Sequence, residues 1–324
     1  MIAERNLLCV VAALGCALSG LASAQSYPSK PIRVIVAFAP GGPADVMARL
    51  VGQRMSAILG QSIVVDNRPG AGGTIGARAV AESDPDGYTL LLGNTSTLVI
   101  GPMIHRNVGY DPVRAFVPVA ALGTTSNLLV VNPASPAMSV RELIAIAKAN
   151  PGKLNYSSAG IGTPPHLIGE MFKLKAGVDI VHVPYKGGHP SIQAVIAGET
   201  QLSFENPATA LPLMQAGSVR GLAVTSETRS AQAPDLPTMV EAGVADFTSV
   251  SFTGVVAPAG TPAPVVNRLN AAVNDSLKSP EVAAVLVRLG VEARIASAEE
   301  FAAFVARERA KWTVVAKAAG VQVE

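Results

Sequence analysis

Cysteine is scarce in this 324-residue chain, and both cysteines, Cys9 and Cys16, lie near the N-terminus. They fall within the apolar run Leu7 to Leu18, which follows Arg5 and precedes an A-x-A site at residues 22–24. This pattern is typical of a cleaved secretory signal, and the run is too short to span a bilayer. We therefore expect residues 1–24 to be removed after Ala24, leaving a chain without disulfides or thiolate ligands.

Charged residues are also few, at 15% of the chain, and the formal net charge is +2. This balance gives no reason to expect a nucleic-acid partner, and no basic helix or Cys/His finger occurs. The four histidines show no close-spaced metal-ligand motif. The sequence also lacks the G-x-S-x-G and P-loop motifs. We predict neither an enzyme nor a bound cofactor or metal.

Hydrophobic residues, in contrast, make up 49% of the chain, which also has 30 glycines and 24 prolines. From residue 27 to about residue 120, predicted strands alternate with helical patterns, which implies a parallel sheet with right-handed crossovers. A second such series covers residues 154–225, and a strand at 254–257 returns to the first. Three helices are predicted at 264–278, 280–289 and 298–319. In the last of these, Ser297 is the N-cap and Trp312 is a core residue packed on the first domain.

The predicted fold class is therefore α/β, with two domains that each have a parallel-dominated sheet flanked by helices. Residues 25–131 plus 251–324 would form domain one, and residues 132–250 would form domain two. Two α/β units joined by two crossings, with a cleft between them, are typical of a hinge-closing binding protein.

The turn Pro40-Gly41-Gly42-Pro43 separates a buried strand from an amphipathic helix. The first backbone N–H groups of a helix have no partner within it, so with the helix dipole they can bind an anion. Asp45, in the first helical turn, has two alternative roles. It either complements the helix dipole or accepts hydrogen bonds that fix the loop around a ligand.

Three other polar or glycine-rich stretches follow predicted strands. Ala159 to Thr163, just before Pro164-Pro165-His166, predicts a second helix N-terminal anion site. Residues 70–76 read G-x-G-x-x-x-G, with no acidic residue after the next strand, which favours a structural turn over a dinucleotide site. Asn94-Thr95-Ser96-Thr97 either binds ligand beyond the end of its strand or forms a polar loop.

Six motifs occur in order from about residue 27 to the C-terminus: FAPGGPADVMAR, NRPGAGGTIGA, DGYTLLLGN, KLNYSSAGIGTPPHL, VPYKGGHPSIQAVIAG and APAGTPAPVVNRLN. Together they resemble the solute receptors of tripartite tricarboxylate transporters, the Bug family of periplasmic binding proteins. The resemblance implies a type II-like venus-flytrap fold that binds a small mono- or dicarboxylate in the periplasm. It also implies integral-membrane transporter subunits as partners.

By motif match, the first-turn residues hold one ligand carboxylate, partly through ordered waters, and the second turn, with His166, faces it. Phe252 and Glu205 stand where the family often has Trp and Asp, and we expect both to line or border the pocket. The full set of candidate ligand-binding residues is Pro40, Gly41, Gly42, Asp45, Thr95, Ser96, Ala159, Gly160, Ile161, Gly162, Thr163, His166, Tyr185, Lys186, Gly187 and Glu205.

The leading hypothesis is a monomeric periplasmic receptor that delivers a carboxylate to a membrane transporter. The alternatives are a ligand-sensing partner of a membrane sensor kinase and a secreted α/β enzyme with a dispersed site. Neither turn contains Arg or Lys, and the nearest candidate cation is Lys186. We therefore predict that Gly42→Val abolishes binding and that Lys186→Ala weakens it only partially.

Overall fold

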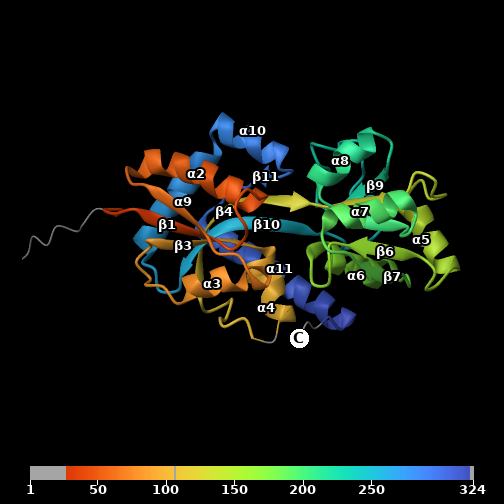
Figure 1. The fold of residues 1–324 in the computed structure, drawn as a ribbon, viewed down its shortest axis with the longest axis horizontal. Coiled ribbons are helices and arrows are strands. Elements are labelled where there is room, and N and C mark those ends of the chain that lie inside the picture. The colour runs from red at the N-terminus through yellow and green to blue at the C-terminus, as the bar shows by residue number, and fades with distance from the viewer. Residues whose placement is uncertain (1–26, 106, 322–324) are drawn as a thin grey trace, which may run out of the picture.

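The computed structural model describes residues 27–105 and 107–321, so the predicted signal segment lies outside the described residues. Two α/β units lie side by side, each built on its own sheet (Figure 1). One sheet has the strand order β11-β4-β10-β3-β1-β2, and the other has the order β7-β6-β8-β5-β9. We call the units around these sheets lobe one and lobe two. Within the described residues, no helix combines the length and the apolarity that a membrane span requires.

Lobe one is formed by the first part of the chain together with its C-terminal part. Its elements are β1 (Ile32–Val36), α2 (Pro43–Leu59), β2 (Ile63–Asn67), the 3₁₀ helix η1 (Ala71–Gly73), α3 (Thr74–Ala81), β3 (Thr89–Asn94), the π-helix η2 (Ser96–Ile100), α4 (Gly101–Ile104), β4 (Phe116–Ser126), β10 (Val250–Pro258), α9 (Ala263–Leu277), α10 (Pro280–Arg288), β11 (Glu292–Ala293) and α11 (Ala298–Ala319).

Lobe two is formed by the middle of the chain. Its elements are β5 (Leu128–Val131), α5 (Val140–Ala149), β6 (Asn155–Ser158), α6 (Pro164–Ala176), β7 (Val181–Pro184), α7 (Gly188–Ala197), β8 (Leu202–Glu205), α8 (Pro207–Gln215) and β9 (Arg220–Val224). The sequence prediction omitted α8, whose N-cap Asn206 accepts a hydrogen bond from the Ala208 N–H.

The predicted α/β fold class is confirmed, but both sheets are mixed rather than parallel-dominated. β1 runs parallel to β2 and β3, whereas β10 runs antiparallel to β3 and β4. In lobe two, β5 runs antiparallel to both β8 and β9. The antiparallel strands β10 and β5 lie next to the segments that connect the two lobes. The strand–helix alternation in the rest of the chain does not reveal their direction. β5 therefore belongs to lobe two, and the predicted domain boundary at 131/132 would move to about Asn127.

Thr225 is hydrogen-bonded to both chain segments that connect the lobes, at Asn127 and at Ser249. Its hydroxyl donates to the Ser249 carbonyl at 2.6 Å and accepts from the Asn127 N–H at 2.8 Å. Its backbone N–H donates to the Asn127 carbonyl at 2.9 Å, and its carbonyl accepts from the Ser249 N–H at 2.7 Å. Asn127, Thr225 and Ser249 are all buried. One buried residue thus fixes the two crossings relative to each other.

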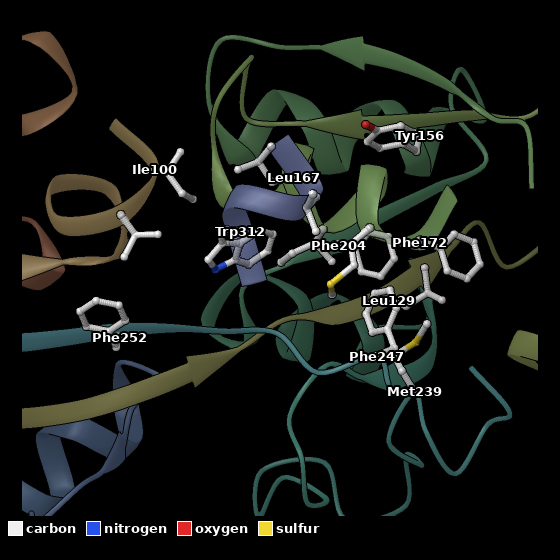
Figure 2. Packing of buried hydrophobic residues seen from close by; sticks show 14 of the residues in the cluster. Ile100, Leu129, Tyr156, Leu167, Phe172, Phe204, Met239, Phe247, Phe252 and Trp312 are labelled. Atoms are coloured by element: carbon white, nitrogen blue, oxygen red, sulfur yellow. The ribbon is translucent and has the colours of Figure 1, made fainter. Parts of the chain in front are cut away.

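Helix α11 packs against both lobes. It begins with the predicted capping box, in which Ser297 Oγ accepts from the Glu300 N–H and the Glu300 carboxylate accepts from the Ser297 N–H. Farther along, α11 contacts β4 of lobe one and α6 of lobe two. Trp312 is buried as predicted, and it shares a hydrophobic cluster with Leu167 and Phe204 of lobe two (Figure 2). The helix therefore packs on lobe one as predicted, and it also packs on lobe two, a contact that the sequence did not predict.

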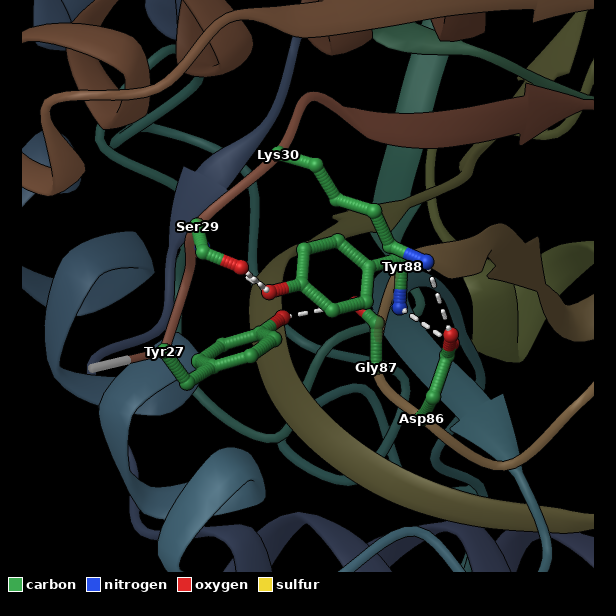
Figure 3. A network of polar contacts seen from close by, with 6 residues as sticks. All are labelled: Tyr27, Ser29, Lys30, Asp86, Gly87 and Tyr88. Carbon is green, nitrogen blue, oxygen red and sulfur yellow. Dashed lines mark hydrogen bonds and ion pairs between the residues drawn. The ribbon is translucent and has the colours of Figure 1, made fainter. Parts of the chain in front are cut away.

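The first described residues are tied to the loop before β3 (Figure 3). The Tyr27 hydroxyl donates to the Gly87 carbonyl at 2.6 Å, and the Tyr88 hydroxyl accepts from the Ser29 N–H at 2.8 Å. Lys30 pairs with Asp86 at 3.3 Å, and both side chains are largely exposed. None of these residues lines the cavity between the lobes.

Candidate ligand-binding site

The two lobes meet around a cavity of about 710 Å³. Such a volume suits a small ligand. Asn94 at the end of β3 comes from lobe one, and Asn206 and Thr209 at the start of α8 come from lobe two. These positions follow the carboxyl ends of strands, where open α/β sheets bind ligands. The other lining residues are Phe38, Ala39, Pro40, Gly42, Pro43, Ala44, Met47, Thr125, Ala208, Thr253, Leu289 and Val291.

The turn before α2 brings a helix N-terminus to this cavity. Gly42 is the N-cap with an extended backbone (φ −76°), and Pro43 is the first helical residue. The N–H groups of Ala44 and Asp45 lie in the first turn, where a helix offers them no acceptor. Gly41 has φ +81°, a conformation that favours glycine. The start of α2 can therefore hold an anion with backbone donors and the helix dipole.

The Asp45 side chain fixes this turn by hydrogen bonds. Its Oδ2 accepts hydrogen bonds from the Gly41 N–H and from Arg49 Nε, both at 2.9 Å. Arg49 also donates to Asn67 Oδ1 at 3.0 Å, and Asn67 donates to the Phe38 carbonyl at 3.1 Å. The Arg49 guanidinium lowers the pKa of Asp45 to about 2, so the carboxyl is ionised at neutral pH. Of the two roles considered for Asp45, these contacts favour loop fixation.

The other carboxylate oxygen, Asp45 Oδ1, is buried and has no hydrogen-bond partner within the described residues. A buried carboxylate oxygen without a donor is costly. This oxygen can accept one further hydrogen bond, from an ordered water or from a ligand O–H or N–H group.

The polar residues at the end of β3 divide into two kinds. The Thr95 side chain is buried, and its Oγ1 accepts from the Phe252 N–H at 2.8 Å, so it joins β3 to β10 instead of lining the cavity. Ser96 is half-buried and begins η2. Asn94, which was not among the candidates, lines the cavity. Its Oδ1 accepts from the Thr97 N–H at 3.0 Å, which leaves its amide N–H groups for other partners.

The turn before α6, unlike the turn before α2, has few free backbone N–H donors. Pro164 and Pro165 begin α6 and have no N–H groups. The Gly162 N–H donates to His166 Nδ1 at 3.0 Å, and the Thr163 N–H donates to the Gly160 carbonyl at 3.3 Å. These contacts do not support the predicted second anion site at the start of α6. His166 instead fixes the loop, with Nδ1 as an acceptor.

His166, which is buried, and His182, which is half-buried, form a neutral pair beneath this turn. Their rings stack with centroids 4.0 Å apart, and His182 Nε2 lies 2.6 Å from Ser158 Oγ. Burial lowers the pKa of both side chains, that of His182 to about 4. At neutral pH neither histidine supplies positive charge to a ligand.

The predicted lobe-two loops do lie together. The Gly187 N–H donates to the Ala159 carbonyl at 3.2 Å, which joins the loops after β6 and β7. Ile161 and Lys186 are exposed, and the Tyr185 hydroxyl donates to Glu199 at 3.2 Å. Among all the candidate residues, only Pro40 and Gly42 line the cavity itself. The others belong to the first turn or its helix, follow β3 in lobe one, or lie in lobe two at the ends of β6, β7 and β8.

Phe252 does not border the cavity, and that prediction is wrong. Its side chain is buried and packs edge-on against Phe301 and Phe304, with centroids 6.0 and 5.6 Å apart. It occupies the core beneath β10, because alternate residues of a strand point to opposite faces. Thr253, the next residue, lines the cavity instead.

Comparison with known proteins identifies the family. Residues 47–321 match the family described as "Tripartite tricarboxylate transporter family receptor". The protein BugT of Bordetella pertussis is 37% identical over 303 residues, which cover 93% of each chain. The chain belongs to this receptor family. It is a family of periplasmic binding proteins and not of enzymes.

Two solved structures of similar proteins contain carboxylates. The R. palustris protein Rpa4515, with adipate, is 38% identical and has a TM-score of 0.76; the match covers 91% of this chain and 99% of that one. MatC from Rhodopseudomonas palustris, with bound malate, is 32% identical with a TM-score of 0.72, covering 89% and 99% of the two chains.

Within residues 27–105 and 107–321, no cluster of three or more His, Cys, Asp or Glu side chains could hold a metal ion.

Proposed function

We propose that this receptor captures a small mono- or dicarboxylate between its lobes and delivers it to integral-membrane transporter subunits. The observation that carries the proposal is the start of α2, which lines the inter-lobe cavity and is held in place by Asp45. The adipate and malate in the similar structures support the same class of ligand.

The expected affinity follows from the donors at the first turn. Hydrogen bonds to a charged group contribute about 1.5–3 kcal/mol each. A helix N-terminus adds about 0.3–1 kcal/mol, and more where it is partly buried. Four such bonds, with the side chains of Asn94 and Asn206 among the donors, would total about 6–12 kcal/mol before ordering and desolvation costs. A dissociation constant near the micromolar range is therefore expected without an arginine clamp.

Lobe closure is part of the proposal, because each lobe contributes only part of the cavity wall. Thr225 lies at both crossings, so it is the position about which the lobes would rotate. Helix α11 contacts both lobes and would have to shift against α6 as they close. Ligand-driven closure of this kind is a hinge motion.

A thermal-shift screen of carboxylic acids, each paired with its neutral primary amide, tests this function. A carboxylate at about 100 times its Kd stabilises the protein by roughly 2.7 kcal/mol, which raises Tm by several degrees. We expect at least one small carboxylate to raise Tm while its amide has no effect. If no carboxylate raises Tm, or if amides act equally, the proposed function is wrong.

A further inference from the structure

The cavity between the lobes has an apolar wall, which is formed by Phe38, Met47, Leu289 and Val291 of lobe one. Met47 belongs to α2, Leu289 is the C-cap of α10, and Val291 precedes β11. Met47 and Val291 are buried, whereas Phe38 and Leu289 are half-buried. Side chains of this kind gain most from contact with an apolar part of a ligand, because both surfaces then leave water.

The turn between α10 and β11 brings the apolar wall against lobe two. A Cβ added to Gly290, within this turn, would lie 3.4 Å from Pro207 Cβ and 3.6 Å from the Ala208 nitrogen. The Gln232 side chain of lobe two also donates a hydrogen bond to the Val287 carbonyl of α10. The apolar wall therefore lies at the boundary between the lobes, beside the start of α8 (Figure 1).

The start of α8 lines the same cavity, but its backbone donors are already occupied. Asn206 Oδ1 accepts from the Ala208 N–H at 2.9 Å. The Asn206 carbonyl accepts from the N–H groups of Thr209 and Ala210 at 3.0 and 2.9 Å. Pro207, the first residue of the helix, has no N–H group. The start of α8 therefore offers no second anion site to match the start of α2.

The cavity also lacks a charged side chain. Its polar lining consists of the amides of Asn94 and Asn206 and the hydroxyls of Thr125, Thr209 and Thr253, and none of the described lining residues is Lys, Arg or His. These neutral groups can help the start of α2 to hold one carboxylate. A second carboxylate in the same cavity would lose its water without gaining a cation, and it would repel the first.

We infer that the receptor selects monocarboxylates with an uncharged, largely apolar body, and that this body contacts the apolar wall. The inference rests on the proposed function and narrows it to acids that carry a single charge. The start of α2 holds the carboxylate, and the transfer of the apolar body out of water adds affinity. Dicarboxylates bind more weakly, because the cavity leaves their second charge without a partner, which is specificity by exclusion.

Isothermal titration of isosteric ligand pairs tests this selectivity. The pairs are 4-methylpentanoate with succinate, 6-methylheptanoate with adipate, and 4-isopropylbenzoate with terephthalate, in which an isopropyl group replaces one carboxylate. Wild-type protein should bind the monocarboxylate of at least one pair at least about tenfold more tightly than its dicarboxylate. Leu289→Lys places a cation in the apolar wall and should reverse this preference. Val287→Lys is the matched control, because its exposed side chain does not line the cavity, and it should leave the preference unchanged.

The outcomes separate the two proposals. If wild-type protein prefers the monocarboxylate of no pair, the inferred selectivity is wrong, while carboxylate binding itself stands. If Leu289→Lys folds, as judged by circular dichroism, and keeps the wild-type preference, the apolar wall does not contact the ligand and the inference is overturned. If no acid of either kind binds, here or in the thermal-shift screen, the proposed function fails as well. Should Leu289→Lys not fold, Leu289→Gln should reduce the preference by at least about threefold, and an unchanged preference would again overturn the inference.

Discussion

Replacing Asp45 by Ala should weaken ligand binding through the first turn. The substitution removes the acceptor that holds the Gly41 N–H and leaves Arg49 without its carboxylate. The loop from Pro40 to Gly42 then loses the hydrogen bond that holds it to α2. The ligand would have to order this loop on binding, although no ligand contact to the Asp45 side chain itself is assumed.

The magnitude follows from the contacts that are lost. Fixing one residue of backbone costs about 1–2 kcal/mol, so re-ordering one or two residues costs about 1–4 kcal/mol and should weaken binding by about 5- to 1000-fold. The hydrogen bond from Gly41 to the buried carboxylate contributes about 1.5–3 kcal/mol to folding. The pair with Arg49 adds less, because the Arg49 side chain is 54% exposed and solvent screens the interaction. The free energy of unfolding should fall by about 1.5–3 kcal/mol.

The assay is isothermal titration with the carboxylate that the screen identifies, together with urea denaturation. Asp86→Ala is the control, because Asp86 is an exposed acid paired with Lys30 away from the cavity. It should change Kd by less than twofold. If Asp45→Ala lowers stability but leaves Kd unchanged, the carboxylate serves only the fold and the loop needs no support to bind.

Two further predictions concern stability. Burial holds the pKa of His182 at about 4, below its ordinary 6.5, so the unfolded chain binds more protons between these values. The free energy of unfolding should therefore decrease by about 2–3 kcal/mol as pH falls from about 6.5 to 4, and it should stay level above pH 7. Urea denaturation of wild type and of His182→Gln across this pH range measures the decrease, which the variant should lack. If the variant loses as much stability as wild type, His182 is not the group that causes the decrease. Thr225→Val removes a buried hydroxyl that joins both crossings. It should lower the free energy of unfolding by about 2–4 kcal/mol in urea denaturation, and a loss below about 0.5 kcal/mol would mean that the crossings do not depend on it.

The sequence predicted the features that local chemistry decides. The Ser297 cap with Glu300 is confirmed because both partners lie within one helical turn. The turn between β1 and α2 was predicted from its Pro and Gly residues, and the structure places it at the cavity. Such signals depend on neighbouring residues, which a sequence displays directly.

The features that were missed depend on contacts between distant segments. The mixed direction of the sheets follows from which strands pair, and no local pattern encodes that. The role of Thr95 depends on the N–H of Phe252, 157 residues away. The pairing of Asp45 with Arg49 was visible as an i, i+4 spacing and could have been predicted. So could the shortage of donors at Pro164 and Pro165, since proline has no N–H.

The most direct test of the central claim compares Gly42→Val with Lys186→Ala by isothermal titration. The structure allows Val at Gly42, because φ is −76° and a Cβ would only touch the Ala39 carbonyl at 3.6 Å. Any loss of binding would therefore come from the side chain that enters the cavity beside the start of α2. Circular dichroism and Tm should show both variants folded.

The account predicts that Gly42→Val abolishes binding of the identified carboxylate, whereas Lys186→Ala, at an exposed side chain, weakens it by no more than about tenfold. If Gly42→Val binds as well as wild type and Lys186→Ala does not bind, the carboxylate is held by the lysine and the turn before α2 is not the anion site.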